Sequence, residues 1–217
     1  LMGESALASL DRENNMHGVA KLIGDQLFVT RRDPSITDTT LPAEVERYSF
    51  DGDSFSFETR YADQCPRLHG AGANDHALVF GCSDGVLVID LADPTYPASK
   101  LGNPASIAVD GRIGTVAAHH DVEELVGIAG DQLFVIDVEN SSAPYQELDI
   151  GSGVDRVAQG FDAHGEVFYV LGDDGDLRLF HPADDWALAH TISVTGPLGD
   201  GTETPAITAS AASDFLY

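Results

Sequence analysis

Short apolar runs separated by turns rich in Gly and Asp make up most of the chain. In one example, the runs 78–82 and 86–89 flank the turn Ser83-Asp84-Gly85. Runs of β-branched and aromatic residues on both sides of such a turn are typical of a β-hairpin. We find no helical period of useful length in the sequence. The pattern therefore predicts an all-β protein.

The same hairpin pattern recurs at a spacing of about 45 residues. After 78–90 it is found at 125–137 and again at 168–180. The string 24–29, Gly-Asp-Gln-Leu-Phe-Val, is also identical to the string 130–135. Each repeat divides into four short strands, and four-stranded units with a period of about 40 to 50 residues are typical of propeller blades. The sequence thus predicts a β-propeller of four-stranded antiparallel blades.

We assign the whole chain, 1–217, to one partial propeller domain of about four and a half blades. The blades are expected at 16–61, 68–102, 114–150 and 157–194, with the end of a preceding blade at 1–10 and the start of a further one at 206–217. An open row leaves sheet faces uncovered. We therefore expect a fragment of a seven- or eight-bladed propeller. A β-sandwich is the alternative, but sandwiches do not repeat a four-strand unit in this way.

The charge balance is strongly acidic. There are 36 Asp and Glu residues against 11 Lys and Arg, which gives a formal net charge of −25. Such a surface repels phosphate backbones and attracts cations, so we expect no nucleic-acid partner. No run of about 18 apolar residues occurs, so we expect no membrane span.

Two histidines occupy equivalent positions in neighbouring blades. His17 and His69 are each followed by Gly, and each opens an expected innermost strand, 17–22 or 68–73. Two imidazoles on adjacent inner strands would face the same channel mouth. Neutral imidazole is a common zinc ligand, and zinc takes three or four N, S or O donors. The alternative is a pair of histidines that hydrogen-bond in the channel lining.

A second group, His119-His120-Asp121, stands near the end of the first strand of the third blade. In simple register it sits lower in the channel than the first pair, and an exposed turn is the alternative interpretation. Asp33, which follows a second strand of the first blade, could supply an oxygen donor to a nearby metal.

The two cysteines are placed to form a bridge. Cys65 precedes the first strand of its blade and Cys82 ends the second strand. Antiparallel pairing puts the start of one strand beside the end of the other, within the roughly 4.4–6.8 Å between Cα atoms that a disulfide needs. A disulfide would indicate an oxidising compartment. Ligation of zinc by the two thiolates is the alternative.

The sequence contains no Gly-x-Ser-x-Gly, no Walker-type phosphate loop and no His-Glu-x-x-His string. We therefore expect a protein that is not an enzyme. A propeller enzyme such as a lactonase or a quinone-dependent dehydrogenase ranks below a metal carrier and below a metal-free interaction scaffold.

Three motifs resemble those of one family, the periplasmic zinc chaperones of the AztD type. They are Cys65-Pro66-Arg67-Leu68-His69-Gly70, then 80–88 (Phe-Gly-Cys-Ser-Asp-Gly-Val-Leu-Val), then Arg112-Ile113-Gly114-Thr115 with His119 soon after. The resemblance implies a secreted or periplasmic propeller that binds zinc through histidines and an aspartate. It further implies delivery of the ion to the solute-binding protein of a zinc ABC importer.

By these motifs, the resemblance implies that His17, His69 and His119 ligate zinc and that Cys65 and Cys82 are the family's cysteine pair. We add Asp121 as the expected carboxylate ligand, and His120 stays an alternative to His119. The expected ion is Zn²⁺, although copper and nickel also accept imidazole.

Overall fold

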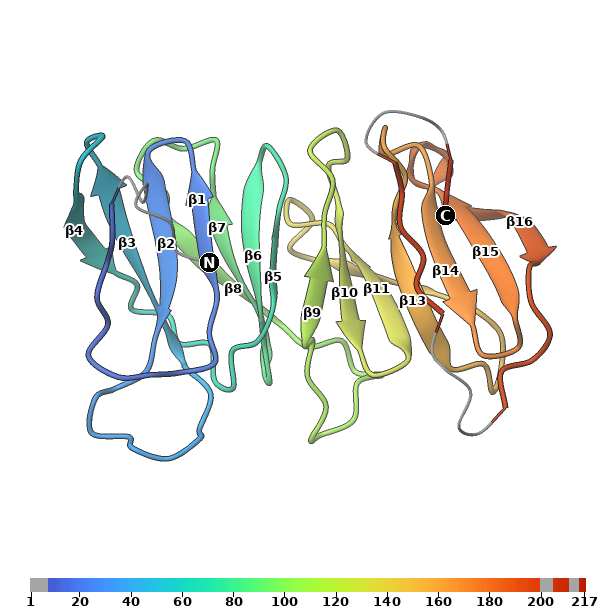
Figure 1. Cartoon of the computed structure of the whole chain (residues 1–217), viewed down its shortest axis with the longest axis horizontal. Coiled ribbons are helices and arrows are strands. Elements are labelled where there is room, and N and C mark those ends of the chain that lie inside the picture. Colours follow the sequence, from blue (N-terminus) through green and yellow to red (C-terminus); the bar gives the residue numbers. More distant parts are fainter. Residues whose placement is uncertain (1–7, 200–204, 211–214) are drawn as a thin grey trace.

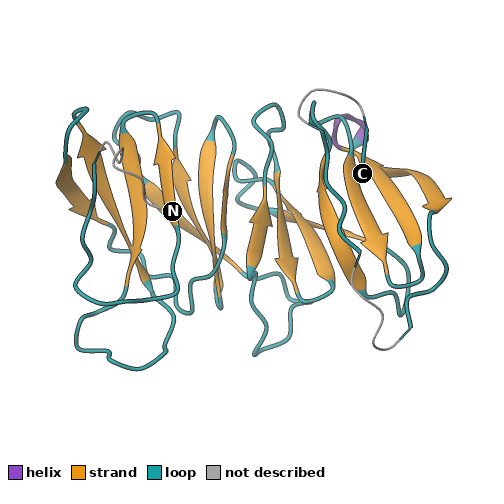
Figure 2. Ribbon diagram, viewed as in Figure 1, coloured by secondary structure: helices purple, strands orange, loops and turns teal. Residues whose placement is uncertain are grey.

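The computed structural model describes residues 8–199, 205–210 and 215–217. Within these residues the chain forms antiparallel β-sheets joined by loops, and a single short 3₁₀ turn at Pro182–Asp184 (Figure 2). This described part holds no helix with the length and apolarity required to cross a bilayer.

Each sheet consists of four strands that follow one another in the sequence and pair in that order. The first sheet contains β1 (Ala20–Ile23), β2 (Gln26–Arg31), β3 (Glu44–Phe50) and β4 (Phe55–Arg60). The second contains β5 (Ala71–Ala73), β6 (Ala77–Cys82), β7 (Gly85–Asp90) and β8 (Ala98–Gly102). The third contains β9 (Thr115–Ala117), β10 (Leu125–Ala129), β11 (Gln132–Ile136) and β12 (Tyr145–Leu148). The fourth contains β13 (Arg156–Phe161), β14 (Phe168–Gly172), β15 (Asp176–His181) and β16 (Ala187–Ser193).

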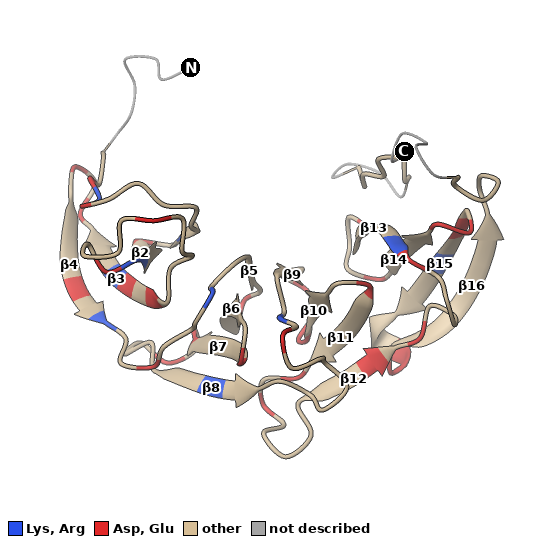
Figure 3. Ribbon diagram, turned by 90° about the horizontal axis from the view of Figure 1, so that it is seen from below, with Lys and Arg blue, Asp and Glu red and all other residues tan. Residues whose placement is uncertain are grey.

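The sheets stand side by side in a row that curves (Figure 1). Seen from below, β5, β9 and β13 lie on the concave side of the arc, and β4, β8, β12 and β16 lie on the convex side (Figure 3). The first strand of each sheet is therefore the one nearest the centre of the arc. This arrangement is that of a partial β-propeller, which confirms the fold class predicted from the repeats.

The core lies between neighbouring sheets. Every residue of β6 is buried, because alternate side chains of a strand point to opposite faces and a sheet packs on each face. Leu78 and Phe80 join a cluster that includes Phe28 of the first sheet. Val79 joins a different cluster that includes Phe134 of the third sheet. Continuous apolar runs, rather than alternating ones, are the consequence of this two-sided burial.

The identical strings 24–29 and 130–135 occupy different places in their blades. The first begins in the turn between β1 and β2, where Ile23 pairs with Gln26. The second begins in the turn between β10 and β11, where Ala129 pairs with Gln132. The identity therefore reflects the same two-residue hairpin chemistry and not equivalent positions in the repeat.

A further hairpin begins after the fourth sheet. Ala209 forms an isolated antiparallel bridge with Leu216, and the backbones of Thr208 and Tyr217 exchange two hydrogen bonds of 3.0 Å. Ala209 and Leu216 pack against a cluster of the fourth sheet that contains Tyr169. At the other end, the expected strand at 1–10 falls largely on residues 1–7, which lie outside the described residues.

Candidate metal centre

The rings of His17 and His69 meet at the start of the innermost strands. His17 lies just before β1 and His69 just before β5. Their ring centroids are 4.8 Å apart and the planes are tilted by only 13°, so the rings stack. The structure thus brings together the two histidines that the sequence placed at equivalent positions.

A glycine after each histidine lets the chains approach closely. A Cβ atom on Gly18 would lie 2.3 Å from the hydroxyl oxygen of Thr30. Gly70 has φ +71°, and a Cβ atom there would lie 2.6 Å from the carbonyl oxygen of Gly114 in the next blade. Neither contact is possible for a residue with a side chain, and a positive φ also favours glycine. The repeated His-Gly pair is therefore a requirement of packing near the centre of the arc.

His69 is held in place by backbone pairing and by the disulfide. Its N–H donates to the carbonyl of Gly81 at 3.0 Å, which continues the pairing of β5 and β6 beyond the regular strands. Cys65 and Cys82 are joined with a Cα–Cα distance of 4.9 Å, and both are fully buried. The predicted disulfide is confirmed, and ligation of zinc by free thiolates is set aside because neither cysteine is free.

The protonation of the His69 ring follows from its hydrogen bond. Nδ1 lies 2.7 Å from the carbonyl oxygen of Gly114. A carbonyl oxygen can only accept, so Nδ1 carries the proton and donates it. Nε2 is then left with the lone pair that a metal would use. Metal-binding histidines commonly donate their other ring N–H to a backbone carbonyl, which fixes the tautomer and the ring orientation.

The segment that leads into His17 is fixed by a buried arginine. Arg32 is only 7% exposed, and its guanidinium donates to the carbonyls of Asn15, Asp38 and Thr40 at 2.7, 2.7 and 2.9 Å. It therefore ties the chain just before His17 to the loop that follows β2. This support, like the Gly114 carbonyl, has no motif that would reveal it in the sequence.

Asp33 lies at the same end of the first sheet, since β2 is antiparallel to β1. Its carboxylate is exposed and accepts hydrogen bonds from the hydroxyl of Ser35 at 2.7 Å and from the N–H of Ser35 at 2.9 Å. The side-chain hydrogen bond, with the backbone one, holds the pKa of Asp33 below its ordinary value. Asp33 therefore adds negative charge at this end of the sheet.

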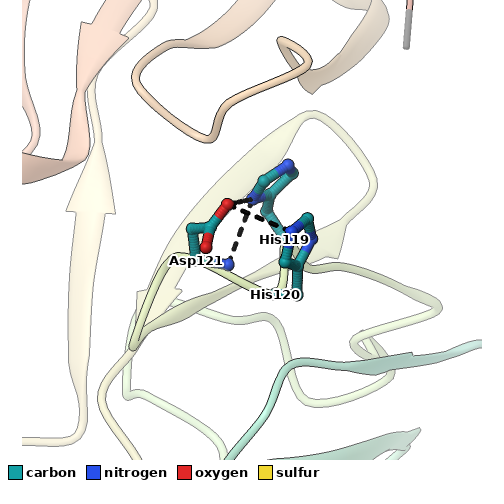
Figure 4. Close-up of side chains that lie close together, drawn as sticks. All are labelled: His119, His120 and Asp121. Carbon is teal, nitrogen blue, oxygen red and sulfur yellow. Dashed lines mark hydrogen bonds and ion pairs between the residues drawn. The ribbon is translucent and has the colours of Figure 1, made fainter.

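His119, His120 and Asp121 form a separate group in the turn after β9 (Figure 4). Their potential ligand atoms all lie within 4.8 Å of one another. A carboxylate oxygen of Asp121 is 3.1 Å from Nε2 of His120 and 3.8 Å from Nδ1 of His119. Among the described residues, no other group of three or more His, Cys, Asp or Glu comes together in this way.

The four expected ligands are divided between two places. β5 and β9 run side by side in the same direction, because Gly70 faces Gly114 while Gly72 faces Val116 and Ala118. His69 contacts Gly114 at one end of these strands, and His119 follows at the other end. Five residues of extended chain span on the order of 15 Å. His119 and Asp121 are therefore not gathered around the His17–His69 pair, and His120 joins them instead.

No family model matches the sequence, and the search of curated proteins also found no match. Solved structures do match. Apo AztD from Citrobacter koseri has a TM-score of 0.69 and 20% identity, covering 90% of this chain and 51% of that chain. A second Citrobacter koseri AztD structure has a TM-score of 0.69 and 19% identity, covering 89% of this chain and 50% of that chain.

The β-propeller domain of Cps50 (Swd1) from Myceliophteria thermophila has a TM-score of 0.58 and 11% identity, covering 92% of this chain and 61% of that chain. At these identities the likeness shows the fold, which is that of an AztD-like propeller. The chain spans about half the length of the AztD structures that it matches.

Proposed function

We propose that this protein is a zinc carrier of the periplasm that delivers Zn²⁺ to the solute-binding protein of a zinc ABC importer. In this proposal it carries the ion and is not an enzyme. The observation that carries the proposal is the stacked pair of His17 and His69, whose ring centroids are 4.8 Å apart at the mouth of the arc. The zinc-chaperone motifs in the sequence and the AztD-like fold support the same function.

The donor set suits an ion that must leave again. Closed structural zinc sites use four protein ligands, often thiolates, whereas sites that exchange a ligand keep a position open. Around the pair, no third His, Cys, Asp or Glu ligand atom of the described residues completes a group. Two imidazoles would leave the remaining positions of a tetrahedral ion to water or to donors of the receiving protein. Such a site can pass zinc on by ligand exchange.

The compartment and the charge are consistent with this role. A buried structural disulfide, Cys65–Cys82, belongs to an oxidising environment such as the periplasm. The net charge of −25 raises the local concentration of cations around the protein. Both features favour a carrier that collects a divalent ion outside the cytoplasm.

Binding is tested by equilibrium dialysis with Zn²⁺ on the purified protein and on His17→Ala, His69→Ala and the double variant. We expect each single substitution to weaken zinc binding by at least tenfold, since each removes one of two imidazole ligands. His190→Ala is the matched control, because His190 is exposed on the outermost strand β16. Unchanged zinc binding in the double variant would contradict the proposal.

Delivery is tested by mixing the zinc-loaded protein with the apo solute-binding protein of a zinc ABC importer. Both the zinc-loaded protein and free Zn²⁺ are offered to the apo protein in the presence of a chelator. Zinc from the loaded protein should reach the solute-binding protein faster, because direct transfer avoids release into solution. If the chelator abolishes the transfer, the protein binds zinc but does not deliver it, and the carrier proposal is wrong.

A further inference from the structure

The loops that lead into β5 and β9 lie next to each other on the concave side of the arc (Figure 3). Each loop carries one arginine. Arg67 lies two residues before His69, and Arg112 lies two residues before Gly114. The His69 ring donates to the Gly114 carbonyl at 2.7 Å, so the two loops are in direct contact at this point. Two positively charged residues therefore flank the ring that belongs to the proposed zinc pair.

The two arginines occupy the same place in the repeat. The N–H of His69 donates to the carbonyl of the residue before the last of β6, at 3.0 Å. The N–H of Gly114 donates in the same way to the residue before the last of β10, at 2.9 Å. Because each arginine precedes such an N–H by two residues, the packing of neighbouring blades sets Arg67 and Arg112 side by side.

The side chain of Arg112 folds back over the backbone that holds the His69 ring. Its Nε lies 3.4 Å from the position that a Cβ atom on Gly114 would occupy, and its Cγ lies 3.9 Å from that position. Arg112 is half-buried, whereas Arg67 is exposed. One guanidinium is thus packed in place, and the other is accessible to a partner from solvent.

The backbone of Arg67 is held in an unusual conformation. Its φ is +53°, a left-handed value that is unfavourable for a residue with a side chain. The N–H groups of Cys65 and Leu68 donate to carbonyls of the chain just before β3, at 2.8 and 2.9 Å. The disulfide to Cys82 fixes the same segment. Such strain persists where the surrounding structure imposes it, and it is common at positions that clamp a ligand.

Neither guanidinium forms an ion pair or a hydrogen bond with the described part of the chain. Arg60 and Arg178 differ in this respect, because hydrogen bonds with carboxylates raise the pKa of each. For Arg112, burial and the positive charge of Arg67 lower the pKa below its ordinary value. Two like charges therefore lie close together without an anion, in a protein whose net charge is −25.

The carboxylates that share a cavity with Arg67 are engaged elsewhere. This cavity, of about 350 Å³, is also lined by Asp33 and Glu44. Glu44 forms an ion pair with Arg31. The Asp33 carboxylate accepts two hydrogen bonds from Ser35. The cavity leaves room beside Arg67 for an acidic side chain of another molecule.

We propose that Arg67 and Arg112 bind a carboxylate of the protein that receives zinc and hold it beside His17 and His69. A guanidinium pairs with a carboxylate through two parallel hydrogen bonds, so two guanidinium groups without partners suit this group. A carboxylate is also a zinc ligand, so the same group can take an open position on the ion. The identity of the partner rests on the proposed carrier function, whereas carboxylate binding is measurable without zinc.

The charge of the remaining surface would orient the partner. With 36 Asp and Glu residues against 11 Lys and Arg, most of the surface repels an acidic group. Complementary charge at one place and like charge elsewhere favour one docking orientation and raise its rate of formation. An acidic partner would therefore dock with its carboxylate next to the zinc pair.

The first experiment measures carboxylate binding by the metal-free protein from the NMR signals of its arginine Nε–H groups. The probes are a capped tri-glutamate peptide and succinate, a free dicarboxylate. We expect the peptide to shift the Arg112 signal, and Arg67→Gln/Arg112→Gln to bind it at least tenfold more weakly. Arg112→Lys keeps the charge but loses the planar fork, so it should also bind more weakly. Lys21→Gln on β1 is the control for loss of a positive charge and should bind the peptide as the wild type does.

The second experiment repeats the transfer assay with zinc-loaded Arg67→Gln/Arg112→Gln and the apo solute-binding protein. Its zinc affinity in equilibrium dialysis should equal or exceed that of the wild type, because positive charges near a cation are removed. Its transfer rate should be at least tenfold lower, because the carboxylate of the partner is no longer held. His17→Ala/His69→Ala would instead lose the ion, so the two defects are distinguishable.

The outcomes separate this proposal from the carrier function. If the arginine variants bind the peptide as tightly as the wild type does, the carboxylate site is overturned, and the carrier function stands as long as zinc is retained. If only succinate binds and transfer is unaffected, the arginines hold a small free anion and the proposed partner is wrong. If the wild type retains no zinc, the carrier function fails, and loss of peptide binding in the arginine variants would still support the carboxylate site.

Discussion

The imidazole of His69 donates from Nδ1 to the carbonyl oxygen of Gly114 at 2.7 Å, across the boundary between the second and third blades. Gly114 directly precedes β9 and His69 lies two residues before β5, so the bond joins the same ends of the innermost strands of neighbouring blades. The orientation of the ring is consequently set by the packing of two blades and not by its own strand alone.

Gly70→Ala tests this close packing. The new Cβ atom would lie 2.6 Å from the Gly114 carbonyl and the residue would keep φ near +71°, so the His69 backbone must move. We expect a loss of about 1–3 kcal/mol in the free energy of unfolding and weaker zinc binding by the pair. Urea unfolding and equilibrium dialysis measure the two effects.

Gly24→Ala is the control for Gly70→Ala. Gly24 also has a positive φ, +58°, but a Cβ atom there meets nothing within 4 Å. It should cost about 1 kcal/mol from backbone strain alone and leave zinc binding unchanged. Equal losses of zinc affinity in both variants would show that the contact with Gly114 does not orient His69.

Loss of the disulfide should loosen the loop that carries His69. The bridge closes a loop with a sequence separation of 17, and in the chain-entropy model such a cross-link stabilises by about 3 kcal/mol. We expect Cys65→Ala/Cys82→Ala to lower the free energy of unfolding by about that amount and to weaken zinc binding at His17 and His69. A variant with wild-type stability would contradict the first expectation.

The hairpins could be predicted from the sequence, because their signal is local. The apolar run 78–82 of the second blade falls within β6, Ala77–Cys82. The innermost strands were predicted too long, at 17–22 and 68–73 against Ala20–Ile23 and Ala71–Ala73. Residues before β1 continue the pairing irregularly, because the Val19 N–H donates to the Thr30 hydroxyl at 2.9 Å while the Val19 carbonyl accepts from the Thr30 N–H at 3.0 Å.

The candidate site could be predicted in part. Equivalent His-Gly pairs were enough to predict that His17 and His69 meet, because they occupy the same place in two repeats. The distance of His119 from the His17–His69 pair could not be predicted from the sequence pattern. It depends on how β5 and β9 are aligned along their length. The rings of His69 and His119 form hydrogen bonds with the backbone carbonyls of Gly114 and Ala163, respectively. Every residue has such a carbonyl, so the residue type at these positions could not predict the bonds.

A buried carboxylate in the first blade should make the protein sensitive to acid. Glu46 on β3 is 4% exposed and accepts hydrogen bonds from Arg12 at 2.7 Å, Arg60 at 2.8 Å and Tyr48 at 2.9 Å. Burial alone would raise the pKa of Glu46, but these hydrogen bonds outweigh it and lower the pKa below the ordinary value of 4.5. A carboxyl with a lowered pKa stabilises the fold fully above its unfolded value, and this stability is lost as the pH falls through the folded value.

Glu46→Gln removes the charge that this pH dependence requires. At pH 7 we expect it to cost about 1–3 kcal/mol, because the partly buried Arg12 and the exposed Arg60 lose a charged partner. The difference from the wild type should shrink as the pH falls below about 4. Thermal unfolding between pH 3 and pH 7 measures both effects, and Glu58→Gln on exposed β4 is the control. A difference that is constant over this range would show that Glu46 does not carry the acid sensitivity.

Arg32 should position His17 rather than contact zinc. Its guanidinium donates to the carbonyls of Asn15, Asp38 and Thr40, so it holds the chain two residues before His17. In Arg32→Lys a single ammonium replaces this planar fork and cannot reach all three carbonyls. We expect a loss on the order of 2–3 kcal/mol in the free energy of unfolding and a zinc affinity at least threefold weaker.

Stability loss alone would not distinguish positioning from general weakening of the blade, so the control must be another arginine of the same sheet. Arg47 on β3 donates to the side chain of Gln26 and lies over the Tyr96 ring, away from the segment before His17. Arg47→Lys should lower stability without changing the zinc affinity of the folded protein. In Arg32→Lys the NMR signals of the His17 ring should also shift in the metal-free state, because the stacked geometry with His69 is disturbed. If both variants keep wild-type zinc affinity and His17 signals, the pair is held by the stacking of the two rings and Arg32 serves the loop alone.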